Sequence, residues 1–253
     1  MKLVRFIAES FSPIPMWGSL EGDTVYGISL PTLGRTGQNW RRSSLKMLPP
    51  ASPSKIVCVG RNYVAHAAEL GNEVLSEPGL FLKAPNTLVP TNSTVAYPAW
   101  SDNFHFEGEL ALVLKRQVKK ITPEKALETV LGYTCALDLT ARDKQKSDLQ
   151  WFRAKGADGF LPIGPHLETV LDPSNVQVTT RVNGVTKQDS STAQMIYNVP
   201  FIISYVSQFM TLESGDVIIT GTPEGVGPLE AGDKVEVEVS GIGVLETMIG
   251  PKA

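Results

Sequence analysis

The sequence predicts an α+β protein that is mostly β, with a small β module at its N-terminus and one large domain after it. Short apolar or alternating stretches recur along the chain, as is typical of strands. The 22 glycines and 18 prolines interrupt these stretches too often for long helices. A length of 253 residues suits one large domain with an appendage. We place the module and its linker at residues 1–50 and the main domain at residues 51–253.

The composition narrows the class of protein. Hydrophobic residues make up 42% and charged residues 19%, as in a soluble globular protein with an ample core. The formal net charge is -3 and there is no basic patch, which argues against nucleic acid as a partner. No stretch approaches the roughly 20 apolar residues of a membrane span, so we expect no membrane partner. Cys58 and Cys135 lie in apolar runs, which favours buried free thiols and a cytoplasmic location.

The first 50 residues read as a small β module. Alternating stretches predict strands at residues 2–7, 15–20 and 24–28. The sequence Glu21-Gly22-Asp23 between the last two is a hairpin signal. The polar residues 34–44, followed by Pro49 and Pro50, predict a linker into the main domain.

Residues 104–114 form the most informative stretch, because a polar start runs into a continuous apolar strand. Side chains alternate along a strand, so Glu107 and Glu109 should share one face, with Gly108 on the other. Two neighbouring carboxylates repel each other and are costly to bury without a counter-charge. A hard divalent cation bound between the carboxylates removes both problems. The alternative is a pair of solvated glutamates on an edge strand, which needs no cation. His105 lies on the same predicted face, so a histidine with two carboxylates could instead hold Fe(II).

A predicted strand at residues 55–60 leads into a short helix at residues 64–71. On this helix His66 and Glu69 are three residues apart and therefore neighbours on one face. A carboxylate beside an imidazole orients the ring and makes it a plausible general base. A surface pair without catalytic role fits the same spacing. The polar segment that continues to Pro78 predicts a mobile lid.

Two charged residues stand at the ends of predicted strands. Lys83 ends the strand at residues 77–85, where it could meet an anionic substrate or simply extend to solvent. Asp138 ends the apolar strand at residues 133–138. It fits a third oxygen ligand beside Glu107 and Glu109, and equally the N-cap of a helix that opens at residues 140–143.

Two later loops can stabilise negative charge. Lys155 lies in a predicted glycine-flanked loop among apolar residues, where an ammonium can stabilise an enolate or a carboxylate. Residues 216–227 read as a buried strand that runs into a Gly/Pro turn. The backbone amides and the Thr222 hydroxyl of such a turn can hold an oxyanion, and a plain turn is the alternative. The turn lacks the lysine and glycine spacing of a P-loop.

The remaining elements follow from standard signals. Thr122-Pro123 predicts a helix start, with the helix ending near residues 131–132. Asn183-Gly184 predicts the turn of a hairpin at residues 176–188. A core-facing helix at residues 201–212 opens at Asn198, and two strands follow at residues 234–239 and 243–248.

Six motifs, which follow one another along the chain in the order given below, together resemble the fumarylacetoacetate hydrolase family. The resemblance is closest to its branch of acylpyruvate hydrolases and oxaloacetate decarboxylases and covers roughly residues 54–249. The first 50 residues resemble, more weakly, a small β module of some bacterial members. The motifs are Arg61-Asn62-Tyr63 with His66 and Glu69, Phe81-Leu82-Lys83, His105 to Glu109, Asp138 to Asp143, Ala154-Lys155, and Thr220 to Gly227.

The resemblance implies a mixed β-sandwich roll and a homodimer. It implies one Mg²⁺ or Mn²⁺ per subunit, held by Glu107, Glu109 and Asp138, and it makes His105 either a neighbour that supports the metal ligands or a structural residue. The implied catalytic residues are His66, Glu69 and Lys155. The implied substrate-binding residues are Arg61, Lys83, Arg142, Gln145, Gly221 and Thr222.

The implied activity is cleavage of the C3–C4 bond of a small anionic 2-oxo acid through a metal-stabilised pyruvate enolate. Hydrolysis of acylpyruvates and decarboxylation of oxaloacetate would share most of the site. An isomerase or tautomerase of 2-oxo or 2-hydroxy dienoates or of oxaloacetate is the first alternative. A non-catalytic binding protein is the second, and three converging acids beside a lid base argue against it.

Overall fold

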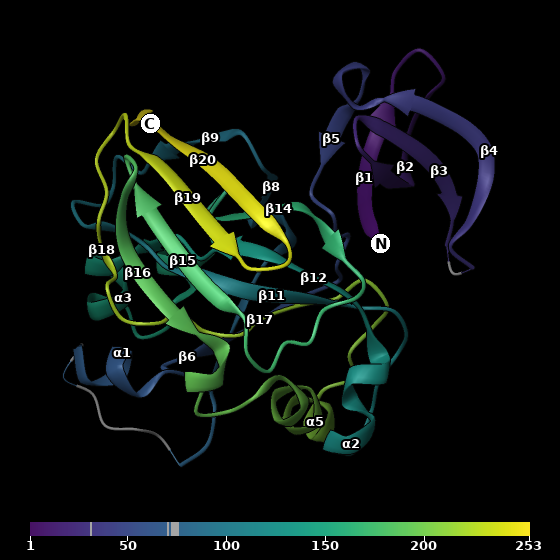
Figure 1. Cartoon of the computed structure of the whole chain (residues 1–253). Helices are drawn as coiled ribbons and strands as arrows, with labels where there is room; N and C mark the ends of the chain where they lie inside the picture. Colours follow the sequence, from purple (N-terminus) through teal and green to yellow (C-terminus); the bar gives the residue numbers. More distant parts are fainter. Residues whose placement is uncertain (31, 70, 72–75) are drawn as a thin grey trace.

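The computed structural model describes residues 1–30, 32–69, 71 and 76–253 (Figure 1). Its largest sheet has twelve strands, which run through both the N-terminal lobe and the main body. The strands are β1 Lys2–Ala8, β2 Ser12–Glu21, β3 Thr24–Ser29, β4 Gly34–Arg41, β5 Lys46–Leu48, β6 Ile56–Gly60, β7 Gly79–Lys83, β8 Leu88–Pro90, β11 Gly108–Leu114, β12 Val130–Leu137, β14 Leu161–Glu168 and β17 Val217–Ile219.

Two smaller sheets complete the β structure. One has five strands: β9 Ser93–Tyr97, β15 Gln177–Val182, β16 Val185–Ser191, β19 Lys234–Val239 and β20 Gly243–Lys252. The other has three: β10 Phe104–Phe106, β13 Thr140–Ala141 and β18 Gly227–Pro228. Most pairs are antiparallel, but β6 with β17, β8 with β14 and β9 with β20 are parallel. The described residues therefore confirm the predicted fold class, a mostly β protein with mixed sheets.

The helices are short. The α-helices are α1 Val64–Glu69, α2 Pro123–Ala126, α3 Arg142–Ser147, α4 Phe152–Lys155 and α5 Val199–Phe209. The described residues also contain four short 3₁₀ helices: η1 Arg42–Ser44, η2 Pro85–Thr87, η3 Leu127–Thr129 and η4 Thr192–Gln194. Among the described residues, no helix combines the length and the apolar character needed to cross a membrane.

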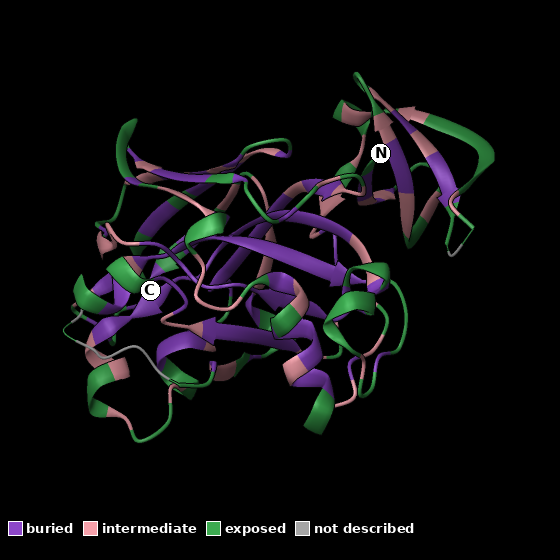
Figure 2. Ribbon diagram, turned by 60° about the horizontal axis from the view of Figure 1, so that its bottom comes forward, coloured by how far each residue is buried: buried purple, intermediate pink, exposed green. Residues whose placement is uncertain are grey.

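The main core lies between the twelve-stranded and five-stranded sheets, where buried strand segments gather (Figure 2). Alternation along β11 divides its side chains between two clusters. Leu110 and Leu112 belong to the cluster between the sheets, and Ala111 and Val113 to the cluster on the other face. The same alternation directs Gly108 toward the five-stranded sheet. Cys58 and Cys135 are buried and free, as predicted.

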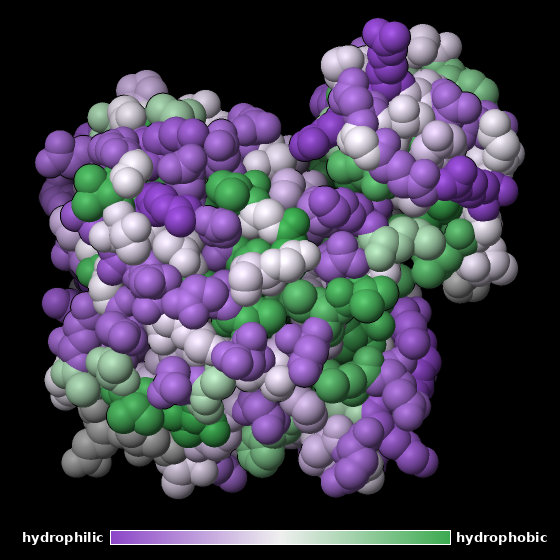
Figure 3. All heavy atoms as spheres, viewed as in Figure 1, coloured by the Kyte–Doolittle hydropathy of each residue, from purple (hydrophilic) through white to green (hydrophobic). Residues whose placement is uncertain are grey.

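The N-terminal lobe continues the large sheet and has its own small core. In Figure 3 it projects from the main body at the upper right. Lys2 and Leu3 of β1 pair with Glu168 and Leu167 of β14. The predicted hairpin joins β2 to β3, but the predicted linker at residues 34–44 is wrong, because β4 pairs with β3 there. Almost every residue of β4 is exposed, so this edge strand has no apolar alternation to reveal it. The boundary near residue 50 stays a prediction and lies between β5 and β6.

Three other predicted elements have informative outcomes. The turn at Asn183 and Gly184 has positive φ at both residues and joins β15 to β16, as predicted. The Asn198 side chain caps α5 by accepting from the Phe201 N–H. The helix predicted from Thr122 to about residue 131 is wrong, because α2 ends at Ala126 and β12 begins at Val130. The Thr129 hydroxyl donates to the Ala126 carbonyl at 2.6 Å and closes a tight turn between the two.

A buried carboxylate fixes the start of the main domain to β17. Asp216 accepts from the N–H groups of Ser54 (2.9 Å), Lys55 (3.1 Å) and Glu213 (2.7 Å). It also accepts from the Ser54 hydroxyl (2.8 Å) and pairs with the Lys55 ammonium (2.5 Å). Burial acts to raise the pKa of Asp216, but Lys55 and these donors outweigh it and lower the pKa below its usual range.

Asp216→Asn is expected to lower the free energy of unfolding by about 2–3 kcal/mol near pH 7, the usual size for hydrogen bonds to a charged group. A depressed folded-state pKa stabilises fully above the unfolded value of about 3.9, and the effect disappears as pH falls through the folded value. Urea unfolding of both proteins at about pH 7 and about pH 3 measures this difference. A difference that is the same at both pH values would contradict the role of the ionised carboxylate.

Candidate active site

Glu107 lies where the chain passes from one sheet to another. β10 ends at Phe106 in the three-stranded sheet, and β11 begins at Gly108 in the twelve-stranded sheet. The single strand predicted for residues 104–114 is therefore wrong, because residue 107 belongs to neither ladder. Glu107 and Glu109 are nevertheless both buried and both line the same cavity. The break lets two acids so close in sequence reach one point from different directions.

Gly108 permits this crossing because the five-stranded sheet approaches its backbone closely. A Cβ atom on Gly108 would lie 1.9 Å from the Thr180 hydroxyl oxygen of β15, so only glycine fits. The Gly108 N–H donates to the side-chain carbonyl of Gln188 in β16 at 2.9 Å. The second sheet thus fixes the backbone between the two glutamates.

Gln188 also holds the turn on the other side of the cavity. Its amide donates to the Thr222 hydroxyl at 2.7 Å and to the Pro223 carbonyl at 2.8 Å. The Thr222 hydroxyl donates its own proton to the Gly108 carbonyl at 2.8 Å. Sequence reasoning missed Gln188, since a lone glutamine in a polar hairpin strand carries no motif or periodicity signal.

Glu107, Glu109 and Asp138 converge. Each offers one carboxylate oxygen, and these oxygens lie within 4.8 Å of one another. Asp138 follows β12 directly, and its N–H donates to the Glu107 carbonyl at 2.8 Å. Asp138 does not cap a helix, because α3 begins at Arg142 after Ala141 and has no side-chain cap. The N-cap interpretation is therefore wrong.

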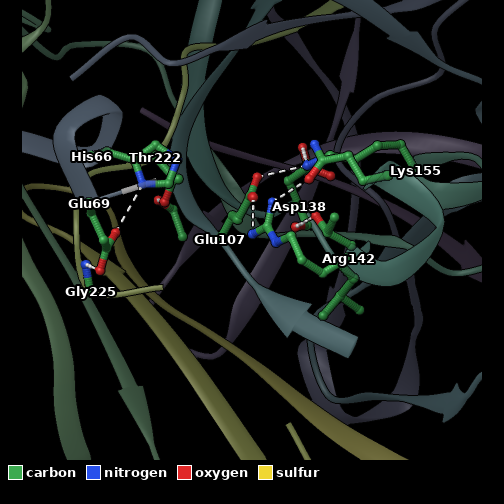
Figure 4. Close-up of polar contacts among 12 residues, drawn as sticks. His66, Glu69, Glu107, Asp138, Arg142, Lys155, Thr222 and Gly225 are labelled. Carbon is green, nitrogen blue, oxygen red and sulfur yellow. Dashed lines mark hydrogen bonds and ion pairs between the residues drawn. The ribbon is translucent and has the colours of Figure 1, made fainter. Parts of the chain in front are cut away.

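Three cations pair with two of these acids, Glu107 and Asp138, and Figure 4 labels two of the cations. The Lys155 ammonium donates to Glu107 and to Asp138, at 2.7 Å each. The Arg142 guanidinium donates to Glu107 at 2.6 Å. The fully buried Lys83 ammonium pairs with the other oxygen of Asp138. Lys155 ends α4 and does not lie in the predicted loop, and Gly156 follows it.

Burial and partners divide the two glutamates electrostatically. Burial acts to raise the pKa of Glu107, but Lys155 and Arg142 hold it well below its usual range. Burial, followed by the charges of Asp138 and Glu107, raises the pKa of Glu109 well above its usual range. Only the Gly221 N–H, which donates to Glu109 at 2.6 Å, opposes this by hydrogen bonding. Glu109 is therefore the acid with most to gain from a nearby positive charge.

The donor set fits a hard divalent cation. Three carboxylate oxygens in one buried cluster are the ligands that Mg²⁺ and Mn²⁺ prefer. Within the described residues, His105 is not part of this cluster, and its Nδ1 has no hydrogen-bond partner. Burial and the charge of Arg142 lower the pKa of His105 to about 4. The Fe(II) arrangement with His105 as a ligand is therefore not the one that this chain forms.

His66 and Glu69 of α1 form the predicted pair. In Figure 4 this pair lies on one side of Glu107, and Arg142 and Lys155 lie on the other. The His66 ring nitrogen Nδ1 lies 3.2 Å from one oxygen of Glu69. The other Glu69 oxygen accepts from the Gly225 N–H at 3.0 Å, which connects α1 to the Gly/Pro turn. Gly225 has φ +94, and a Cβ there would lie 2.0 Å from the Lys187 carbonyl oxygen. Of the predicted lid, Leu70 and residues 72–75 lie outside the described residues.

The cavity has a volume of about 490 Å³. Its walls include most of the predicted site residues: Arg61, His66, Glu69, Glu107, Glu109, Arg142, Gln145, Lys155 and Thr222. Asp138, Lys83 and Gly221 do not line it. Lys83 pairs with Asp138 and the Gly221 N–H donates to Glu109, and the assignment of Lys83 and Gly221 to substrate binding stays a prediction. Lys146, Phe81 and Trp151 line it and were not predicted. The two aromatic rings pack edge to face at 5.3 Å and form an apolar wall.

A histidine–glutamate pair lines the same cavity as two of the three clustered acids, and a mixed β fold carries this site. A family model described as "Fumarylacetoacetate (FAA) hydrolase C-terminal" matches residues 55–249. The chain belongs to the fumarylacetoacetate hydrolase family, whose members include enzymes named as hydrolases, isomerases and tautomerases.

Several relatives have names that state an activity. An Arabidopsis thaliana protein named oxaloacetate tautomerase FAHD1, mitochondrial, is 45% identical over 195 residues, which cover 75% of this chain and 87% of that protein. The structure of 2-hydroxyhepta-2,4-diene-1,7-dioate isomerase from Mycobacterium marinum matches with a TM-score of 0.91 and 39% identity, covering 100% of this chain and 99% of that one. Fumarylpyruvate hydrolase from Pseudomonas aeruginosa, solved with Mn²⁺ and pyruvate, matches with a TM-score of 0.76 and 34% identity, covering 82% and 92%. Because the Arabidopsis protein is named mitochondrial, the cytoplasmic location stays a prediction.

Proposed function

We propose that this chain is a Mg²⁺- or Mn²⁺-dependent enzyme that cleaves the C3–C4 bond of small 2-oxo acids, as an acylpyruvate hydrolase, an oxaloacetate decarboxylase or both. The observation that carries the proposal is the convergence of Glu107, Glu109 and Asp138, since both glutamates of this cluster line the cavity that His66 also lines. These three residues would hold the cation. When bound, the cation supplies a Lewis acid that stabilises the negative charge developing on the 2-oxo group.

The chain's own residues supply the rest. Lys155 places a buried ammonium beside Glu107 and Asp138, where it adds positive charge close to the enolate oxygen. In acylpyruvate hydrolysis, Glu69 orients His66, which removes a proton from the water that attacks the distal carbonyl. The C3–C4 electron pair passes into the pyruvate enolate, which a proton then converts to pyruvate. Decarboxylation of oxaloacetate forms the same enolate as CO₂ leaves, without attacking water.

A tautomerase of oxaloacetate is the second candidate, favoured by the name of the Arabidopsis relative. Interconversion of the enol and keto forms needs the same charge stabilisation and one proton transfer at C3, and no bond between carbons breaks. The homodimer predicted for this chain is a further proposal that both candidates share.

The deciding experiment measures pyruvate release from oxaloacetate and from acetylpyruvate with Mg²⁺, Mn²⁺ or EDTA. Protein-free controls correct for decarboxylation by the free metal ion. We expect release that EDTA abolishes, and the ratio of the two rates distinguishes hydrolase from decarboxylase. No pyruvate from either substrate by the metal-loaded protein would overturn C–C cleavage, and an oxaloacetate enol–keto assay would then test the tautomerase.

His66→Ala is expected to lower acetylpyruvate hydrolysis by about 10²–10⁴-fold, the usual contribution of a general base. Oxaloacetate decarboxylation should fall much less, because no water needs activation. Steady-state rates on both substrates, with Mn²⁺ saturating, measure the two effects. Equal loss of both activities would contradict this division of roles.

A further inference from the structure

One buried glutamine is bonded to groups that leave no choice in the direction of its hydrogen bonds. The Gln188 side-chain oxygen lies 2.9 Å from the Gly108 N–H, which can only donate. The Gln188 side-chain nitrogen lies 2.8 Å from the Pro223 carbonyl, which can only accept. The orientation of the amide is therefore fixed, and the same nitrogen donates to the Thr222 hydroxyl at 2.7 Å. Gln188 is 1% exposed, so bulk water does not compete for these bonds.

The Thr222 hydroxyl is committed by its two neighbours. A hydroxyl has one proton to donate and two positions at which it accepts. One accepting position takes the Gln188 amide, and the proton is donated to the Gly108 carbonyl at 2.8 Å. Gly108 is buried, so turning the proton away would leave a buried carbonyl short of a hydrogen bond. Thr222 lines the cavity, and toward a ligand there its hydroxyl can only accept.

His66 offers a second acceptor to the same cavity. Its Nδ1 lies 3.2 Å from the Glu69 carboxylate, which when ionised can only accept, so Nδ1 carries the proton. The Nε2 atom of the neutral ring is then an acceptor. The Glu69 carboxylate also accepts from the Gly225 N–H at 3.0 Å, which connects α1 to the turn that carries Thr222. In Figure 4 the labelled His66 and Thr222 lie on the same side of Glu107, and both residues line the cavity.

We propose that Gln188 is a positioning residue that makes the Thr222 hydroxyl an acceptor for the attacking water of acylpyruvate hydrolysis. The inference rests on the proposed function, which it deepens. A water molecule that donates one proton to His66 and the other to Thr222 keeps its lone pairs for the distal carbonyl. A substrate carboxylate or an oxyanion has no proton to give and is a poor ligand for two acceptors. Thr222 thus serves hydrolysis, and decarboxylation, which uses no attacking water, does not need it.

The step balances without a further reactant. The water oxygen bonds to the distal carbonyl carbon while one water proton passes to Nε2 of His66. The C3–C4 bond breaks, its electron pair leaves with the pyruvate enolate, and His66 returns the proton to C3. The second water proton, directed to Thr222 at the start, remains on the carboxylic acid that leaves.

Thr222→Val tests the acceptor role, because valine keeps the branched shape of threonine and removes the hydroxyl. With Mg²⁺-loaded protein, kcat for acetylpyruvate hydrolysis should fall about tenfold, the effect of one lost hydrogen bond. The KM for acetylpyruvate and the calorimetric Kd for pyruvate should stay within about twofold, because the water belongs to neither ligand. Thr222→Ser keeps the hydroxyl and should restore most of kcat.

Thr220→Val is the matched control. The Thr220 hydroxyl also donates to a carbonyl of β11, that of Leu110 at 2.9 Å, but Thr220 does not line the cavity. This variant should keep kcat within about twofold of wild type. Gln188→Met should lower kcat in the wild-type background and change it little further in Thr222→Val, because Gln188 acts through that hydroxyl.

Three results would overturn the inference: an equal fall in kcat for Thr220→Val, a higher KM with unchanged kcat for Thr222→Val, or additive losses in the double variant with Gln188→Met. Each leaves pyruvate release by the wild type intact. Failure of the proposed function differs, because the wild type itself would then release no pyruvate from either substrate. A wild type that decarboxylates oxaloacetate but does not hydrolyse acetylpyruvate would overturn the inference and leave the decarboxylase standing.

Discussion

Gly108→Ala is expected to lower turnover by about a hundredfold or more, the usual consequence of moving reacting groups by about 1 Å. The new methyl group would lie 1.9 Å from the Thr180 hydroxyl oxygen, so the backbone between Glu107 and Glu109 must shift. Both carboxylates would then leave their common point. We therefore expect weaker Mn²⁺ binding by calorimetry as well as lower kcat, with the fold retained by circular dichroism.

A second substitution should restore the site. The Thr180 hydroxyl is buried without a hydrogen-bond partner among the described residues, so Thr180→Ala sacrifices no hydrogen bond. In the double variant, the nearest remaining contacts of the new Cβ would be 3.3 Å, to the Thr180 Cβ and the Gln188 side-chain oxygen. Gly108→Ala with Thr180→Ala should therefore recover much of the Mn²⁺ affinity. A double variant as impaired as the single one would show that steric contact with Thr180 is not the cause.

Lys155→Met should destabilise the metal-free protein by about 3–5 kcal/mol, the usual effect of removing one partner of a buried ion pair. Without this ammonium, the Glu107 and Asp138 carboxylates lose the cation that both contact at 2.7 Å. Added Mn²⁺ should restore part of the loss, since it supplies positive charge at the same acids. Urea unfolding with Mn²⁺ and with EDTA measures both effects.

Arg153→Met provides the matched comparison. Arg153 lies in the same helix, α4, but its pair with Asp148 is on the surface, so its removal should change little. If Lys155→Met were as stable as wild type in EDTA, the buried ammonium would not be the counter-charge that we infer.

The sequence predicted the elements that alternation and turn chemistry specify. Residues 176–188 illustrate this, because alternation predicts both strands and Asn183-Gly184 predicts the turn between them. The acids Glu107, Glu109 and Asp138 could also be identified, since carboxylates at the edges of apolar strands are chemically unusual. β4 could not be predicted, because an exposed edge strand is specified by its neighbour's backbone and not by its own side chains.

The geometry within the site also lay beyond sequence reasoning. The strand break at Glu107 depends on Thr180 and Gln188, which are distant in sequence and belong to the other sheet. The partner of Lys83 also could not be predicted from the sequence. The position of this lysine at a strand end predicted a contact with substrate, whereas its buried ion pair with Asp138 becomes visible only in the packing.

The pairing of Glu107 and Asp138 with three buried cations has a consequence for how the protein matures. Acidic metal sites without counter-ions repel themselves until the ion arrives, and such domains depend on the ion to fold. Here Lys83, Arg142 and Lys155 arrive on the same chain as the acids. We therefore expect a newly made chain to reach its native state without the ion and to acquire the ion afterwards.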